Sequence, residues 1–112
     1  MALDLACFRE KLLARREELL AEDRMSEADR APVTLDQDSV GRLSRIDAMQ
    51  VQAMALAQAR RRQSERSAID AALRRIDEGE FGYCLTCGED IAPARLEHNP
   101  TAVTCIGCAS RA

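Results

Sequence analysis

Two cysteine pairs near the C-terminus constrain this 112-residue chain more than any other feature. Cys84 and Cys87 form one C-x-x-C pair, Cys105 and Cys108 form a second, and residues 88–104 separate the two pairs. A tight turn can place both sulfurs of such a pair on one ion, and zinc takes four tetrahedral ligands that include thiolates. The spacing matches a four-cysteine zinc pattern. It therefore predicts that these four residues hold one Zn²⁺.

The predicted metal site has the composition of a structural site. Four protein ligands leave no open coordination position on zinc, so the ion is expected to be structural and not catalytic. A redox role for either pair is disfavoured, because no alternating strand–helix pattern surrounds the cysteines. The chain also shows no nucleophile–base set, phosphate loop or nucleotide fingerprint. We therefore expect a protein that is not an enzyme, with a small module at residues 79–112 that needs its metal to fold.

The N-terminal part of the chain has the periodicity of an amphipathic helix. From about residue 4 to 27 no Gly or Pro occurs, and Leu5, Phe8, Leu12 and Leu19 recur at helical spacing. Leu13 and Leu20 widen this predicted stripe. Pro32 then breaks the pattern, because proline lacks the N–H group and disfavours a helical residue before it. We expect the first helix to end before this residue, followed by a polar, acidic connection at about residues 28–38.

A second, longer helix is predicted for about residues 38–77, where the apolar residues again recur at helical spacing. Its predicted apolar stripe contains Val40, Leu43, Ile46, Met49, Ala53, Leu56, Ile69, Ala72 and Ile76. Gly79 follows it in the position typical of a helix C-terminus. The two helices are expected to form an antiparallel coiled-coil hairpin over residues 1–78. The fold class is therefore mainly α, with a small four-cysteine zinc module after the hairpin.

Charge and composition limit the classes of partner. The formal net charge is −3 and the pI is about 5.2, whereas a nucleic-acid-binding domain usually carries a basic excess. Direct, sequence-specific DNA binding is therefore disfavoured, and a protein partner is expected. Charged residues interrupt the N-terminal segment, and no stretch has the length and apolarity of a membrane span. Without a secretion signal the paired cysteines indicate metal ligands, and the cytoplasm is the expected location.

An arginine-rich run lies within the second predicted helix. Arg60, Arg61, Arg62 and Arg66 either form a solvated face with local ion pairs or dock on an acidic surface of a partner. The acidic residues of the connection also have two interpretations. They either cap the following helix or reach from the tip of the hairpin into a partner.

The C-terminal motifs resemble those of the DksA/TraR family. The resemblance rests on the segments F-G-Y-C at residues 81–84, A-R-L-E at 94–97, P-T-A at 100–102 and C-I-x-C at 105–108. The helical hairpin in front also resembles that family, and L-D-Q at residues 35–37 is similar to a short, compact branch of it. The likeness covers most of the chain.

The resemblance implies a function, which the spacing of the cysteines alone does not indicate. Members of the family bind bacterial RNA polymerase directly, enter its secondary channel with the coiled coil and bring the tip near the active site. Some act together with the alarmone ppGpp in the stringent response. The resemblance places tip contacts at Asp36, Asp38 and Ser39. The family's tip motif is D-x-x-D-x-A; aligned on Asp36, this chain has Ser39 in place of the second Asp and Gly41 in place of the Ala.

A second hypothesis assigns the protein to another class. The zinc module could act as an interaction adaptor that holds some other protein or nucleic acid without help from the hairpin. In that case residues 79–112 would suffice for binding. The regulator hypothesis instead needs the hairpin and its tip, so a truncated chain distinguishes the two.

Overall fold

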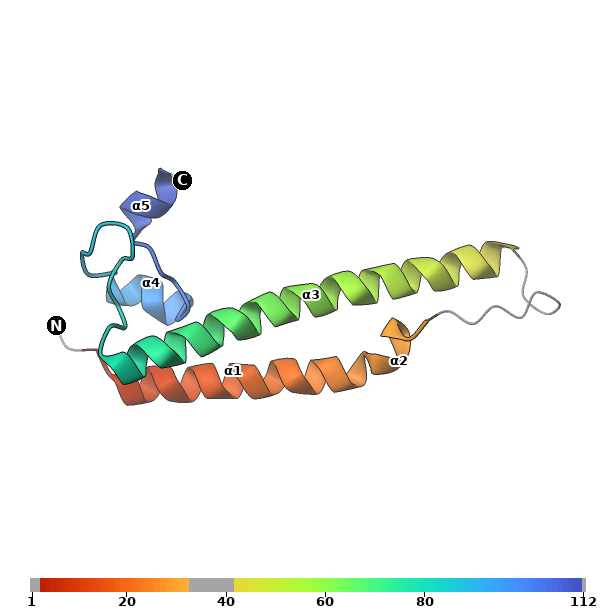
Figure 1. Ribbon diagram of the computed structural model, residues 1–112, viewed down its shortest axis with the longest axis horizontal. Coiled ribbons are helices and arrows are strands. Elements are labelled where there is room, and N and C mark those ends of the chain that lie inside the picture. Colours follow the sequence, from red (N-terminus) through yellow and green to blue (C-terminus); the bar gives the residue numbers. More distant parts are fainter. Residues whose placement is uncertain (1–2, 33–41, 112) are drawn as a thin grey trace. The chain divides into compact units, whose positions relative to one another are not determined.

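The computed structural model describes residues 3–32 and 42–111 and is mainly helical (Figure 1). The helices are α1 (Leu5–Met25), α2 (Glu27–Arg30), α3 (Arg42–Glu78), α4 (Pro93–His98) and α5 (Ile106–Ser110). An antiparallel bridge joins Tyr83 to Asp90 in the segment between α3 and α4. None of the helices in the described ranges combines the length and apolarity needed to cross a membrane.

The long helices α1 and α3 pack against each other and run antiparallel, as predicted. Three ion pairs show the direction, because successively later residues of α1 pair with successively earlier residues of α3. They are Arg9–Asp77, Arg16–Asp70 and Asp23–Arg62. Their members on α1 recur every seven residues, which is the repeat of a coiled-coil seam. The predicted fold class is therefore confirmed.

The chain divides into two compact units. The zinc-bearing unit comprises Met1–Glu17 and Arg66–Ala112, and the shaft unit comprises Glu18–Glu65. The predicted division into a hairpin at residues 1–78 and a zinc module at 79–112 follows the sequence motifs and stays a prediction. The C-terminal part of α3 and the first half of α1 belong to the same unit as the four cysteines.

Most buried apolar residues lie in the zinc-bearing unit. These are Phe8, Leu12, Ile69, Ala72, Ile76, Phe81, Cys84, Ile91, Leu96 and Ala102. The predicted stripes of both helices are confirmed here, with the exceptions of Leu5 and Leu13 of α1, which are 37% and 43% exposed. The Phe8 and Phe81 rings lie 5.3 Å apart, centroid to centroid, in a tilted pair. This pair ties the segment after α3 to α1.

The predicted stripe of α3 is wrong for the shaft unit. Ile46 and Met49 are 41% and 55% exposed and Leu56 is 38% exposed, whereas Ala55 is buried. The face that packs inward here also carries Gln52, whose side-chain amide donates to the Ala31 carbonyl at 3.0 Å. Over residues 46–56 the inward face of α3 therefore carries small and polar residues, and the larger apolar side chains there are exposed; Leu19 of α1 is the large apolar residue that the shaft unit buries fully among the described residues.

The end of α1 is built around two arginines. α1 ends at Met25 and not at about residue 27, and Ser26 separates it from α2. The last carbonyls of a helix lack intrahelical partners, and the Asp23 carbonyl accepts from the Arg30 guanidinium at 2.6 Å. Arg62 donates to the Asp23 carboxylate at 2.6 Å and to the Ser26 hydroxyl at 2.8 Å. This network fixes the break between α1 and α2.

The N-terminal limit predicted for the second helix, at about residue 38, lies outside the described residues, as do Asp36, Asp38, Ser39 and Gly41. The described part of α3 begins at Arg42 and extends to Glu78, one residue beyond the predicted end.

Candidate metal centre

The four cysteines predicted from spacing lie together in space. Cys84 and Cys87 flank a turn after Tyr83, Cys105 is the N-cap residue of α5, and Cys108 lies within that helix. The four Sγ atoms all lie within 4.8 Å of one another, and those of Cys87 and Cys105 are 3.8 Å apart. A tetrahedral zinc site with Zn–S bonds of about 2.3 Å separates its sulfurs by about 3.8 Å. The donor set therefore fits a zinc ion in both chemistry and size.

Backbone hydrogen bonds shape the first turn and join it to the second. The Gly88 N–H donates to the Cys84 carbonyl at 2.9 Å, and the Cys84 N–H donates to the Glu89 carbonyl at 2.8 Å. Gly88 has a φ of +77°, which a residue with a side chain adopts only with strain. The Leu85 N–H donates to the Val103 carbonyl at 2.8 Å. That bond holds the segment before Cys105 against the first C-x-x-C turn.

The thiols differ in their tendency to ionise. Backbone hydrogen bonds at Cys105 and Cys87 lower the pKa of Cys84 to about 6. Side-chain hydrogen bonds with Cys105, Cys84 and Cys87 raise the pKa of Cys108 to about 12. One thiol in the cluster thus ionises readily while another keeps its proton. A divalent cation would displace that proton and stabilise the thiolates, so metal binding is coupled to proton release.

The segment that carries the cysteines buries several apolar residues. Cys84 is 2% exposed, and Ile91, Leu96 and Ala102 are buried. Val103 is half-buried. The Arg95 guanidinium donates to the Thr104 carbonyl at 2.9 Å and so ties α4 to the segment before Cys105. Both α4, through this hydrogen bond, and α5, which carries Cys108 and is capped by Cys105, therefore help to position the second cysteine pair.

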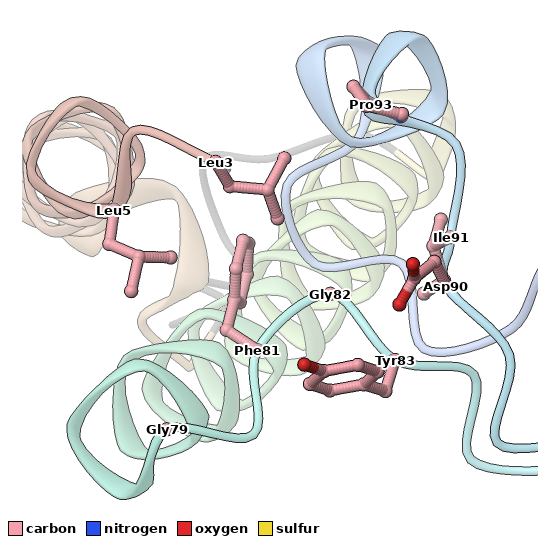
Figure 2. Close-up of a pocket in the computed structure, with 9 residues that line it drawn as sticks. All are labelled: Leu3, Leu5, Gly79, Phe81, Gly82, Tyr83, Asp90, Ile91 and Pro93. Atoms are coloured by element: carbon pink, nitrogen blue, oxygen red, sulfur yellow. The ribbon is translucent and has the colours of Figure 1, made fainter. Parts of the chain in front are cut away.

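A pocket of about 460 Å³ lies in the zinc-bearing unit, lined by the start of the chain and by the segment between α3 and α4 (Figure 2). Its walls are mostly apolar, and the Asp90 carboxylate is the charged group among the residues that line it. They are Leu3, Leu5, Gly79, Phe81, Gly82, Tyr83, Asp90, Ile91 and Pro93. The pocket contains none of the four clustered cysteines.

Comparison with known proteins agrees with the architecture and the cluster. Residues 79–112 match the model of the prokaryotic dksA/traR C4-type zinc finger. A protein of Caulobacter vibrioides named RNA polymerase-binding transcription factor DksA is 36% identical over 104 residues, which cover 93% of this chain and 72% of the relative. The chain belongs to the DksA/TraR family. The predicted resemblance is therefore confirmed, and with it a zinc finger of the four-cysteine type.

Two further relatives of this family member are informative. The Haemophilus influenzae protein of the same name is 52% identical, but over only 40 residues, which cover 36% of this chain and 28% of the relative. The structure of transcription factor DksA2 from Pseudomonas aeruginosa superposes with a TM-score of 0.77 at 28% identity, covering 96% of this chain and 81% of that one. The likeness thus extends over the helices as well as the zinc finger. These relatives are named as transcription factors and not as enzymes.

Two structural features of the protein, one in each compact unit, were not predicted from sequence. The aromatic pair of Phe8 and Phe81 joins residues far apart in the chain, and no periodicity links them. Arg62, predicted as one member of an arginine run, is only 12% exposed at its side chain and forms an ion pair inside the seam. The sequence signal for the buried ion pair of Arg62 would have been the seven-residue spacing of Arg9, Arg16 and Asp23, the charged residues of α1 that pair with α3.

Proposed function

We propose that this protein binds bacterial RNA polymerase and regulates transcription. The observation that carries the proposal is the similarity over 93% of the chain to a protein named as an RNA polymerase-binding transcription factor. The net charge of −3 also supports a protein partner, because direct DNA binding normally requires a basic surface. The protein would carry out this function in the bacterial cytoplasm.

The four cysteines have a supporting role in this proposal. Cys84, Cys87, Cys105 and Cys108 would each give one thiolate to a single zinc ion. Since all four positions are filled by protein, the ion would act in folding and not as a Lewis acid. When bound, zinc supplies the cross-link that a module with so few buried side chains needs.

The family resemblance supports a finer hypothesis about the contact. The antiparallel helices would enter the secondary channel of the polymerase, and Asp36, Asp38 and Ser39 would contact it near the active site. Because only the first acidic residue of the family's tip motif is kept, Asp36 is the residue whose carboxylate is expected to matter most. The alarmone ppGpp is the small molecule expected to modify this action.

Transcription in vitro tests the proposal. Purified polymerase transcribes a ribosomal RNA promoter with and without the full-length protein, and with and without ppGpp, and direct binding is measured in parallel. We expect binding and altered output, and we expect Asp36→Asn to reduce the change in output at equal occupancy. Asp47→Asn, at an exposed position of α3, is the matched control. Absence of binding by the zinc-loaded protein would refute the proposal, and full activity of Asp36→Asn would refute the tip assignment.

The adaptor hypothesis is less well supported by the packing. Phe81, the first apolar residue of residues 79–112, is 5% exposed and packs on Phe8 of α1. A fragment without α1 would expose this ring to water. We therefore expect residues 79–112 alone not to suffice for binding in a pull-down with the truncated chain, and a protein or nucleic acid other than the polymerase held equally by that fragment and by the full-length protein would favour the adaptor.

A further inference from the structure

The pocket in the zinc-bearing unit has the size of a site for a small molecule. Its volume of about 460 Å³ lies within the range of about 300–1,000 Å³ that is usual for such sites. None of the four clustered cysteines lines it. The predicted zinc site and the proposed tip contacts therefore use other residues, and the pocket is available to a further ligand.

Contacts within the zinc-bearing unit hold the walls of the pocket in place. The Ile91 N–H donates to the Gly82 carbonyl at 2.8 Å, and the antiparallel bridge joins Tyr83 to Asp90. Phe81, which forms another wall, is 5% exposed and packs on an aromatic ring of α1. A site whose walls are already ordered loses little conformational entropy when it takes up a ligand, and this favours binding.

Two polar side chains of the lining have no protein partner among the described residues. The Asp90 carboxylate and the Tyr83 phenol both line the pocket, and neither forms a hydrogen bond or an ion pair there (Figure 2). Asp90 is exposed and Tyr83 is 50% exposed, so a ligand that enters from solvent can reach both. An ionised carboxylate only accepts hydrogen bonds, and a phenol oxygen also accepts them. The pair therefore suits a ligand that donates N–H groups.

The charges around the pocket favour a cation. Residues 3–5 and 79–93, the segments that supply its lining, contain Asp4, Glu80, Glu89 and Asp90 but no Lys, Arg or His. The field of these carboxylates attracts a positively charged ligand and repels an anion. The aromatic rings of the lining also attract both apolar groups and cations.

We propose that this pocket binds a small organic amine. The apolar body of the amine lies among the leucine, isoleucine, proline and aromatic side chains of the lining, and its ammonium group lies beside the Asp90 carboxylate. An intact amino acid fits less well, because its own carboxylate would face the acidic wall. The site does not depend on binding to RNA polymerase, so it adds a second kind of ligand to the proposed function.

Three probes that share one ring test the site. Tryptamine carries an ammonium group, 3-propylindole has a methyl group in its place, and indole-3-propionate has a carboxylate. Each is titrated into zinc-loaded, full-length, isotope-labelled protein, and the chemical shifts of the backbone amides are followed by NMR. For tryptamine, with about twelve non-hydrogen atoms, we expect saturable shifts at Gly82 and Ile91 and a Kd on the order of 1 mM. Indole-3-propionate should bind more weakly by about five-fold or more, with 3-propylindole between the two.

A matched pair of substitutions tests the role of the carboxylate. Asp90→Asn keeps the shape of the side chain but removes the charge that lines the pocket. Glu89→Gln is the control, because this neighbouring residue is also exposed and acidic but does not line the pocket. We expect the affinity for tryptamine to fall about three- to five-fold in Asp90→Asn and at most about 1.5-fold in Glu89→Gln. Zinc content and circular dichroism verify that both variants are folded.

The opposite results would overturn the proposal. Absence of saturable shifts with tryptamine, or shifts confined to residues outside the lining, would show that the pocket is not a site for amines. Equal affinity for tryptamine and indole-3-propionate would show that the walls do not select a cation. Equal losses in Asp90→Asn and Glu89→Gln would reduce the effect to the general charge of the protein. All of these measurements are made without RNA polymerase, so their failure would leave the proposed function intact.

Discussion

Two adjacent leucines of α1 provide a test of the packing that the structure assigns to the zinc-bearing unit. Leu12 is 2% exposed and packs in the core, whereas Leu13 is 43% exposed on the same turn of the same helix. The two residues have the same chemistry and helix propensity. Substitution of each by alanine therefore compares burial alone.

The structure sets the expected magnitudes. Leu→Ala removes three carbon groups, worth about 0.8 kcal/mol each when fully buried, and a residual cavity adds to this loss. For Leu12→Ala we expect the free energy of unfolding to fall by about 3–4 kcal/mol. Leu13→Ala removes a side chain that water already reaches, so no closed cavity forms and the loss should be about 1 kcal/mol or less. Natural domains are stable by only about 5–15 kcal/mol, so the first variant should lose a large share of its stability.

Urea denaturation of the zinc-loaded variants, followed by circular dichroism at 222 nm, measures both losses. The expected difference between the variants is about 2 kcal/mol or more, with Leu12→Ala the less stable. Equal destabilisation by the two substitutions, or a larger loss for Leu13→Ala, would show that the register of α1 differs from the one described. A fall in the urea m-value would indicate that the two compact units unfold separately.

Three further predictions concern the metal, the turn after α3 and the ion pair in the seam. Removal of zinc by a chelator should abolish the cooperative unfolding of the zinc-bearing unit, and zinc affinity in a competition titration should fall as the pH is lowered, because protons compete for the thiolates. Gly82→Ala should cost about 1–3 kcal/mol in thermal unfolding, since φ is +95° and a Cβ would lie 2.8 Å from Leu3 Cδ1; Gly79→Ala, with φ +75° but open space around it, should cost less. Arg62→Met should cost about 2 kcal/mol because it removes the charged partner of Asp23 in a pair whose side chains are 12% and 20% exposed, whereas Arg16→Met, in an exposed pair, should cost less than about 1 kcal/mol in the same urea assay. Equal losses in either matched pair would contradict the assigned environments.

The metal cluster could be predicted from sequence because its geometry is largely local. Within each C-x-x-C pair a single turn sets the distance between the sulfurs, so only the meeting of the two turns depends on the rest of the fold. The hydrogen bond from the Leu85 N–H to the Val103 carbonyl holds the two turns together. Because it joins two backbone groups, the residue types at these positions do not predict it. Spacing alone therefore identified the ligands, while the frame around them needed the structure.

The seam of the shaft could not be predicted in the same way. Helical periodicity shows that a helix has an apolar face, but it does not show which partner covers that face. In residues 46–56 the large apolar side chains are exposed, namely Ile46, Met49, Val51, Met54 and Leu56, whereas Ala55 is buried. A prediction that places the largest apolar residues inside is right for Ile69 and Ile76 and wrong for Ile46, Met49 and Leu56.

The same observation accounts for the uneven distribution of buried surface. Among the described residues, the buried hydrophobic residues of the shaft unit are Leu19 and Ala55, and the remainder lie in the zinc-bearing unit. Segments with few buried apolar contacts open at low free energy, and binding elements are drawn from such segments. The Arg62–Asp23 pair gives the shaft a defined arrangement but adds little apolar burial. Because Leu19 and Ala55 are the buried hydrophobic residues of the shaft among the described residues, the shaft is expected to open at a lower free energy than the zinc-bearing unit, and a partner that binds its closed form would raise its stability.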